Sequence, residues 1–167
     1  MNRDNGGTKI AVLTVSDGVV AGTREDLSGK LACAIIEAGL HPDTLTAKIV
    51  PDDGTQIEEA LRTWAGEKYT LIVTSGGTGI SPRDNTPQAT LNVVDYQVPG
   101  IAELMRSESL KKTLMAALSR AVAGVRGRTL IVNLPGSPKG VQECLDAIMP
   151  ILPHAFEQLE SGAGHKQ

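Results

Sequence analysis

The sequence predicts an α/β fold in which helices cover a mostly parallel β-sheet. Two observations carry this expectation. Short apolar segments rich in branched residues alternate along the chain with segments in which apolar residues recur at helical spacing. Such alternation implies right-handed crossovers, which make successive strands parallel and place the connecting helices on the faces of the sheet.

Four segments are typical of strands. Residues 8–15 form an apolar run of the kind that parallel strands show when both faces of the sheet are covered. Similar runs occupy residues 45–50, 69–74 and 129–134. The stretch from residue 110 to residue 128 is the hardest to interpret, because five Lys and Arg residues and two glycines interrupt it.

Helices are expected between and after these strands. The predicted helices cover residues 28–40, 57–64, 86–96, 100–110 and a last segment from residue 141. For the first of them, Ser28 is the expected N-cap and Gly39 the expected end. Its predicted buried face consists of Leu31, Ala34, Ile35 and Ala38.

Prolines mark the start of one of the later helices and interrupt another. Thr86 followed by Pro87 predicts an N-cap with proline in the first helical position. Pro150 and Pro153 should kink the last helix or split it in two, because proline cannot donate the backbone hydrogen bond that a helix interior requires.

Length and charge limit the possible functions. The chain has 167 residues, which predicts one domain over residues 9–160 between flexible segments at 1–8 and 161–167. A net charge of -3 and 2% aromatic residues argue against nucleic-acid partners, which need basic surfaces or stacking rings. There is no apolar run long enough to span a membrane, and the polar start lacks the apolar core of a secretory signal. We therefore expect a cytoplasmic protein with no membrane partner.

Cysteines and histidines do not form a reactive group in this sequence. Cys33 and Cys144 are far apart and surrounded by small and apolar residues, which favours two buried thiols over a disulfide or a zinc site. His41, His154 and His165 all lie away from the ends of the predicted strands. A histidine-based catalytic triad or a zinc site is therefore not expected.

Small polar residues follow each predicted strand. In open α/β sheets, ligands bind beyond the carboxyl ends of the strands, so these connections should share one edge. They contain Ser16-Asp17-Gly18, Asp52-Asp53-Gly54, the segment 75–84 and the segment 135–139. Hydroxyls, carboxylates and a few cations in one place suit a phosphorylated ligand with a divalent metal.

The glycine-rich loop at residues 76–79 is the most specific feature of that edge. Glycines allow positive φ, and successive N–H groups in such a loop can bind an anion. The loop lacks the Gly-Lys-Ser/Thr ending of a Walker A motif, and Pro82 replaces the last glycine of a dinucleotide-binding motif. A plain glycine turn between a strand and a helix remains an alternative.

Asp52 and Asp84 are candidate ligands for Mg²⁺, which proteins hold through one or two carboxylates together with substrate phosphates. Either aspartate, and Asp17 as well, could instead cap a turn or a helix. Three cations could reach phosphates from this edge, although each could equally be an ordinary surface residue: Arg106, Arg120 and Lys139.

Five motifs in register resemble one family. Residues 74–90, TSGGTGISPRDNTPQAT, resemble the signature of molybdopterin adenylyltransferases of the MogA and MoaB type and of the related G domain of gephyrin. Four further segments agree in order and spacing: LTVSD at 13–17, IVPD at 49–52, LSRAVAGVR at 118–126 and LIVNLPGS at 130–137. The resemblance extends from about Ile10 to Leu159.

The resemblance implies a three-layer αβα sandwich of Rossmann-like topology that assembles as a homotrimer. It implies a nucleotidyltransferase that moves AMP from Mg-ATP to the terminal phosphate of molybdopterin and releases pyrophosphate. Asp52 and Asp84 match the catalytic and Mg²⁺-binding aspartates. Residues matching the nucleotide and phosphate contacts are Ser75, Gly76, Gly77, Thr78, Gly79, Arg83, Pro135 and Gly136. Residues matching positions near the pterin are Ser16, Asp17, Ser119, Arg120 and Ser137.

One residue departs from the family pattern. Asn85 stands where the family more often has valine, which leaves the detail of this loop open. Two other functions are compatible with the same motifs: a molybdopterin- or nucleotide-binding carrier or sensor without turnover, and an assembly module like the G domain of gephyrin. A molybdenum-insertase protein is the partner expected to receive the product.

Overall fold

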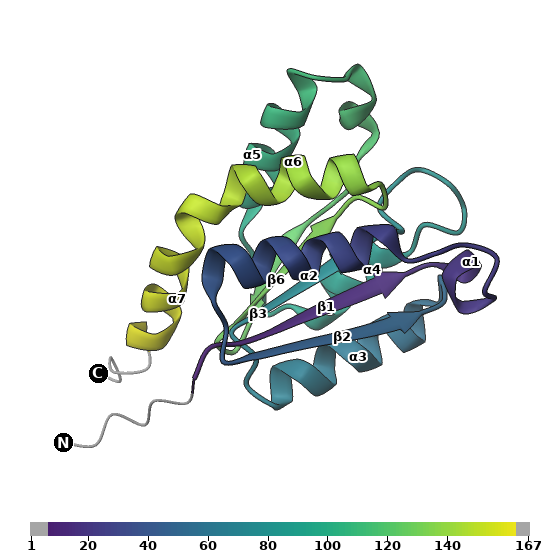
Figure 1. The fold of residues 1–167 in the computed structure, drawn as a ribbon. Helices are drawn as coiled ribbons and strands as arrows, with labels where there is room; N and C mark the ends of the chain where they lie inside the picture. The colour runs from purple at the N-terminus through teal and green to yellow at the C-terminus, as the bar shows by residue number, and fades with distance from the viewer. Residues whose placement is uncertain (1–6, 163–167) are drawn as a thin grey trace.

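A six-stranded sheet forms the middle layer of the computed structural model, which describes residues 7–162 (Figure 1). The strand order is β2-β1-β3-β6-β5-β4. The strands are β1 (Lys9–Val15), β2 (Thr44–Val50), β3 (Leu71–Ser75), β4 (Tyr96–Gln97), β5 (Ala123–Arg126) and β6 (Thr129–Leu134). Strands β2, β1, β3 and β6 run parallel, whereas β5 is antiparallel to both of its neighbours.

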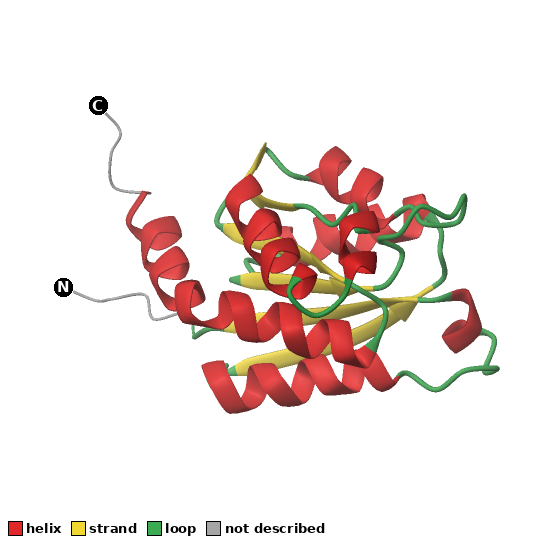
Figure 2. Cartoon of the chain, turned by 90° about the horizontal axis from the view of Figure 1, so that it is seen from above, coloured by secondary structure: helices red, strands yellow, loops and turns green. Residues whose placement is uncertain are grey.

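Helices cover both faces of the sheet, and the view from above shows those on the nearer face (Figure 2). They are α1 (Asp17–Val20), α2 (Leu27–Leu40), α3 (Gly54–Gly66), α4 (Thr86–Val93), α5 (Pro99–Leu110), α6 (Pro138–Ile148) and α7 (Leu152–Ser161), with 3-10 turns η1 (Leu114–Leu118) and η2 (Met149–Ile151). One core joins α2, α5, α6 and α7 to the sheet, and a second joins α3 and α4 to the opposite face. The predicted three-layer α/β architecture is confirmed.

Two topological switch points lie on either side of β3. At each of them, the helices that follow the two neighbouring strands lie on opposite faces of the sheet. The chain leaves β1 toward α2 on one face, leaves β3 toward α4 on the other, and leaves β6 toward α6 on the first face again. Crevices at such points are the usual ligand sites of open α/β sheets. The prediction that the four strand ends share one edge is therefore confirmed, because β1, β2, β3 and β6 run parallel.

The prediction for helix α2 is wrong in detail. Its N-cap is Asp26, not Ser28, because the Asp26 carboxylate accepts a hydrogen bond from the Gly29 N–H at 2.8 Å. The hydroxyl of Thr14 donates to the same carboxylate at 2.8 Å and so anchors it to β1. The helix ends at Leu40, one residue beyond Gly39, and its C-cap is His41 in the left-handed conformation.

The face of α2 that lies against the core is also different from the predicted one. Ala32 and Ile36 are completely buried, whereas Ala34 and Ala38 are exposed and Leu31 and Ile35 are only partly buried. A periodicity of small and apolar residues alone left two adjacent faces of this helix nearly equivalent.

Helix α4 also begins and ends differently from the prediction. Asn85 is the N-cap and makes no side-chain cap bond, while Thr86 is already helical and donates its hydroxyl to the Gly76 carbonyl at 2.9 Å. The helix ends at Val93 rather than near Tyr96, because the next residues form the short strand β4 beside β5. Neither β4 nor β5 was predicted, since β4 has two residues and glycine weakens the pattern of β5.

The last helical segment is split, as the two prolines predict. Helix α6 ends at Ile148, the turn η2 contains Pro150, and α7 begins before Pro153. Helix α6 begins at Pro138, three residues before the predicted start, because Ser137 caps it through a hydrogen bond from the Gly140 N–H at 3.1 Å.

Ser161, the first residue of the segment expected to be flexible, is the last residue of α7. Most of the two terminal segments, residues 1–6 and 163–167, lies outside the described residues, and so does His165. The division of the chain into one domain with two flexible ends stays a prediction. None of the described helices is long and apolar enough to cross a membrane.

Both cysteines are free thiols in the first core. Cys144 is 6% exposed and Cys33 is half-buried. Burial raises the pKa of both thiols, so they remain protonated and unreactive near neutral pH. They behave as the small apolar residues that their sequence surroundings predict.

Candidate active site

Two glycines shape the loop that follows β3. Gly76 has a φ of 102° and Gly77 a φ of 66°, values that side chains other than glycine rarely adopt. A Cβ on Gly76 would overlap the carbonyl oxygen of Val15, and one on Gly77 would overlap the hydroxyl of Thr86. The loop is therefore pressed between the end of β1 and the start of α4, and only glycine fits there.

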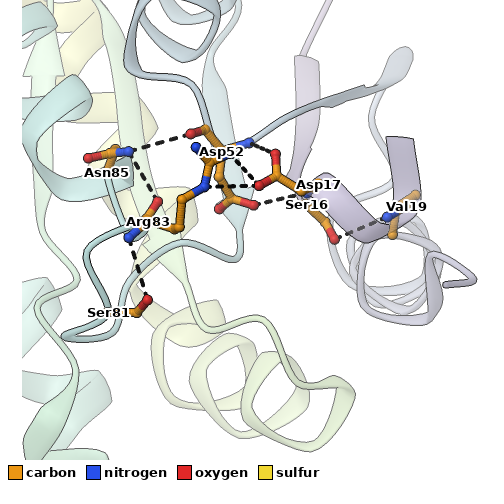
Figure 3. Close-up of polar contacts among 7 residues, drawn as sticks. All are labelled: Ser16, Asp17, Val19, Asp52, Ser81, Arg83 and Asn85. Carbon is orange, nitrogen blue, oxygen red and sulfur yellow. Dashed lines mark hydrogen bonds and ion pairs between the residues drawn. The ribbon is translucent and has the colours of Figure 1, made fainter. Parts of the chain in front are cut away.

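Asp17 and Asp52 bind each other's backbone beside this loop (Figure 3). The Asp17 N–H donates to the Asp52 carboxylate at 2.9 Å, and the Asp52 N–H donates to the Asp17 carboxylate at 2.9 Å. These reciprocal bonds join the ends of β1 and β2. They also place two negative charges close together, which requires compensation.

Arg83 supplies that compensation. Its Nε donates to the Asp17 carboxylate at 3.1 Å, and a second guanidinium nitrogen forms an ion pair with the same oxygen (Figure 3). The hydrogen bond from Arg83 holds the pKa of Asp17 below its ordinary value, and the backbone N–H of Asp52 lowers it further. Asp17 is thus ionised at neutral pH, and the loop that carries Arg83 is tied to the β1 end of the sheet.

Asp84 sits at the far end of the same loop. One oxygen of its carboxylate accepts a hydrogen bond from the Ser81 N–H at 2.8 Å and lies against Gly79. Arg120 fixes the surrounding backbone, since its guanidinium donates to the carbonyls of Gly79 and Asp84, both at 2.6 Å. Asp84 therefore has a defined position, although it lies on a long exposed loop.

Asn85 links this loop to the Asp52 turn. Its side-chain amide donates to the carbonyl of Arg83 at 3.1 Å and to the carbonyl of Asp52 at 3.4 Å (Figure 3). The residue that departs from the family pattern thus has a structural role. A valine at this position could make neither bond.

Two pockets open at the switch points on either side of β3. The β1–β3 pocket, about 510 Å³, lies between the ends of β1 and β3 and the start of α2. The α5–α6 pocket, about 630 Å³, lies between α5, η1 and the start of α6. Both volumes suit small-molecule ligands. The residues that line both pockets are Gly77, Asp84, Gly136 and Ser137.

The donor atoms fit Mg²⁺ bound together with phosphates. Asp52 and Asp84 both line the β1–β3 pocket, and each uses only one carboxylate oxygen in hydrogen bonds with residues 7–162. Within that range there is no cluster of three or more His, Cys, Asp or Glu residues that could hold a metal alone. Two carboxylates without a full protein cage match Mg²⁺, which keeps positions for phosphate and water.

Most of the predicted site residues line one of the two pockets. Ser16, Ser75 and Gly76 line the β1–β3 pocket. The α5–α6 pocket is lined by Thr78, Gly79, Ser119 and Pro135. The residues predicted to lie near the pterin are therefore divided between the pockets, since Ser16 lines one and Ser119 the other.

Three predicted residues line neither pocket and hold the loops instead. Asp17 and Arg83 form the ion pair beside Asp52, and Arg120 binds backbone carbonyls. Ser137 has two roles, because it lines both pockets and also caps α6. The assignment of individual residues to nucleotide, pterin or metal stays a prediction.

The sequence-based interpretation placed residues 135–139 at this edge but did not recognise that α6 begins there, at Pro138. Pro138 lines the β1–β3 pocket, while Lys139 and Gly140 line the α5–α6 pocket. The first turn of a helix carries partial positive charge and favours anions. Ser137 followed by Pro138 is an N-cap signal that could have revealed this helix start.

Comparison with known proteins agrees with this geometry. Residues 11–154 match the family model described as a probable molybdopterin binding domain. A molybdopterin adenylyltransferase of Helicobacter pylori is 44% identical over 150 residues, covering 89% of this chain and 85% of the relative. The chain belongs to the molybdopterin-binding domain family, which includes the molybdopterin adenylyltransferases.

Members of this family occur alone and as parts of longer proteins. The crystal structure of MoaB, a molybdopterin biosynthesis enzyme of Thermus thermophilus, superposes with a TM-score of 0.86 at 49% identity, covering 92% of this chain and 97% of that one. A molybdenum cofactor biosynthesis bifunctional protein of Chlorobaculum tepidum is 38% identical over 94% of this chain but only 50% of its own length. This family member thus functions in molybdenum cofactor biosynthesis.

Proposed function

We propose that the protein transfers AMP from Mg-ATP to the terminal phosphate of molybdopterin and releases pyrophosphate. The observation that carries this proposal is the pair of pockets with a common wall. A transfer between two bulky substrates needs two binding pockets whose reacting ends meet. The common wall contains Gly77 of the glycine loop, which is of a type that can bind phosphate, the carboxylate of Asp84 and the turn at Gly136.

The reaction balances without a protein nucleophile. A terminal phosphate oxygen of molybdopterin attacks the α-phosphorus of ATP, and the bond between that phosphorus and the pyrophosphate oxygen breaks. Adenylyl-molybdopterin and pyrophosphate are the products. Because the attacking oxygen is already anionic, the absence of a histidine among the residues that line these two pockets is compatible with the chemistry.

The protein's task is to align two anions that repel each other. The Gly76 N–H donates to the Leu134 carbonyl at 3.2 Å. The backbone N–H groups that follow it in the glycine loop, together with the positive end of α6, favour phosphates at the common wall. Arg83 neutralises the charge of Asp17, so the carboxylates at the ends of β1 and β2 repel the phosphates less strongly. Arg120 keeps the backbone around Asp84 in place. Alignment of this kind supplies a large part of the acceleration in phosphoryl-type transfers.

Asp52 and Asp84 are the residues that would hold Mg²⁺. The ion would neutralise charge on the phosphates of ATP when it is bound. The residues themselves contribute carboxylate oxygens at the β1–β3 pocket, held in position by the Asp17 and Ser81 N–H groups. We therefore place the polyphosphate of ATP in the β1–β3 pocket and the pterin in the α5–α6 pocket.

Pyrophosphate release by the purified protein tests the proposal. The expected result is release that requires both Mg²⁺ and molybdopterin and disappears in Asp52→Ala. Tight molybdopterin binding without any pyrophosphate release would instead support the alternative of a carrier or sensor. Circular dichroism of Asp52→Ala is the control, because loss of the Asp17 hydrogen bond could also disturb the fold.

Three further expectations belong to this proposal. We expect a homotrimer, a molybdenum insertase that receives the product, and a cytoplasmic location. The bifunctional relative of Chlorobaculum tepidum is about twice the length of this domain. It supports the expectation that a second activity acts close to the one proposed for this domain. Exposed apolar residues on η1 support self-association, since Leu114 is 77% and Met115 66% exposed.

A further inference from the structure

Glu143 is a buried carboxylate in the wall of the α5–α6 pocket. It lies on α6, and its side chain is only 8% exposed. Its Oε1 atom is fully buried and accepts no hydrogen bond from the described residues. Buried polar atoms are nearly always hydrogen-bonded, so this acceptor requires an explanation.

Two lysines lie near the carboxylate of Glu143 without forming a hydrogen bond to it. The ammonium groups of Lys112 and Lys139 lie 3.7 Å and 3.9 Å from Oε1, which is ion-pair distance but too long for a hydrogen bond. Both lysines are more than half exposed and retain freedom to move. Glu143 is therefore an acceptor at the pocket wall that still has hydrogen-bonding capacity.

The rest of the pocket suits a flat heterocycle attached to a phosphate. Its lining includes the glycine loop and the Pro135–Ser137 turn, which favour an anion. Small or flexible apolar side chains also line the pocket, including Ala102, Met105 and Ala121. Methionine adapts its shape to ring systems. Glu143 belongs to the α6 side of the same pocket.

We propose that Glu143 accepts hydrogen bonds from the 2-amino-4-oxo edge of the pterin ring and selects this ring for the α5–α6 pocket. The inference rests on the proposed function. This edge presents the N3–H and the 2-amino group side by side as two adjacent donors. A carboxylate has two acceptor oxygens and no donor, so its chemistry complements an edge that presents two adjacent donors.

The same reasoning disfavours adenine in this pocket. The corresponding edge of adenine presents one amino donor beside a ring nitrogen that is an acceptor. A carboxylate facing that edge would gain one hydrogen bond and repel the neighbouring lone pair. Glu143 thus separates the two substrates, leaving ATP to the β1–β3 pocket near Asp52.

A pair of fluorescent probes tests this inference independently of turnover. The probes are the monophosphates of 6-hydroxymethylpterin and of 6-hydroxymethyllumazine, in which an oxo group replaces the 2-amino group. We expect the wild-type protein to bind the pterin probe at least about tenfold more tightly, since a hydrogen bond to a charged group is lost with lumazine. In Glu143→Gln, the preference should fall to about threefold or less.

The matched control is Asp146→Asn, which removes an exposed carboxylate from the next turn of the same helix. It should keep the wild-type preference. A purely structural role of Glu143, as an anchor for Lys112 and Lys139, would lower the thermal stability of Glu143→Gln but leave the ratio of the two affinities unchanged. That outcome overturns the inference.

Three further results would also contradict it. These are equal affinities of the wild-type protein for the two probes, no binding of the pterin probe, and a loss of ATP affinity instead of pterin affinity in Glu143→Gln. The comparison of probes with the wild-type protein needs no variant, so it stands even if Glu143→Gln does not fold. Failure of the proposed function is distinguished separately, because it would appear as missing molybdopterin-dependent pyrophosphate release by the wild-type protein.

Discussion

Asp17 and Asp52 each accept a hydrogen bond from the other's backbone N–H at 2.9 Å, which joins the carboxyl ends of β1 and β2. This reciprocal pair positions Asp52 without using its second carboxylate oxygen. It also brings two carboxylates together, and Arg83 binds one of them from the loop after β3. The site is therefore preorganised by contacts among three loops that are distant in sequence.

Replacing Arg83 should raise the pKa of Asp17. In Arg83→Met, the largest cause of the lowered pKa is removed, so the carboxyl should titrate closer to its ordinary value of 3.8. The ion pair stabilises the fold at pH values above the unfolded pKa, about 3.9, and this contribution is lost as the pH falls through the folded pKa. NMR titration of the Asp17 carboxyl measures the shift. Arg24→Met, a change in the neighbouring exposed loop, should leave the titration as it is.

Gly76→Ala should destabilise the protein strongly. The new Cβ would require a positive φ and would overlap the Val15 carbonyl. A cost of at least about 2 kcal/mol is expected, which corresponds to a fall in Tm of roughly 4–8 °C. Thermal unfolding measures this. Gly100→Ala, on α5 with open space around it, should change the Tm by little, and an equal fall in both variants would contradict the account.

Asn85→Val should loosen the loop between Arg83 and Asp84. The change removes two side-chain hydrogen bonds to the carbonyls of Arg83 and Asp52. A loss of about 0.5–1.5 kcal/mol in the free energy of unfolding is expected, because one of the two bonds is long. Urea denaturation provides the measurement. If Asn85→Val were as stable as wild type, the bond to the Asp52 turn would have no energetic role.

Asp84→Asn should abolish turnover and keep the fold. The amide oxygen can still accept from the Ser81 N–H, but the negative charge is gone. A fall of about a hundredfold or more in kcat is expected, because an amide is a poorer ligand than a carboxylate for the Mg²⁺ that would neutralise the phosphates. The matched control is Asp53→Asn, which changes an exposed N-cap of α3 next to Asp52. Unchanged activity in Asp84→Asn would remove Asp84 from the mechanism.

The parallel part of the sheet was predictable because its signal is local. Residues 129–134 alone carry enough apolar and branched side chains to predict β6, and the alternation with helices implies the parallel arrangement. By contrast, β4 consists of two residues that become a strand only through pairing with β5. A segment whose structure depends on a distant partner gives little signal in its own sequence.

In the candidate site as well, local features could be predicted from the sequence, whereas contacts between distant segments could not. The glycine loop and the positions of Asp52 and Asp84 after strands were visible in the sequence. The ion pair between Asp17 and Arg83 was not, because 66 residues separate the two. The sequence suggested that Arg120 could reach a phosphate, but it did not reveal that its guanidinium donates to the carbonyls of Gly79 and Asp84. Such side-chain bonds to backbone follow from loop geometry and not from residue type.

The most direct test of the central claim follows the α-phosphate of ATP. The protein is incubated with Mg²⁺, molybdopterin and ATP labelled at that phosphorus, and the products are separated. The account predicts that the label appears on the pterin, in equal amount with released pyrophosphate, and that Asp84→Asn gives neither. Label that remains entirely in ATP while molybdopterin is bound unchanged would contradict it and would indicate a carrier.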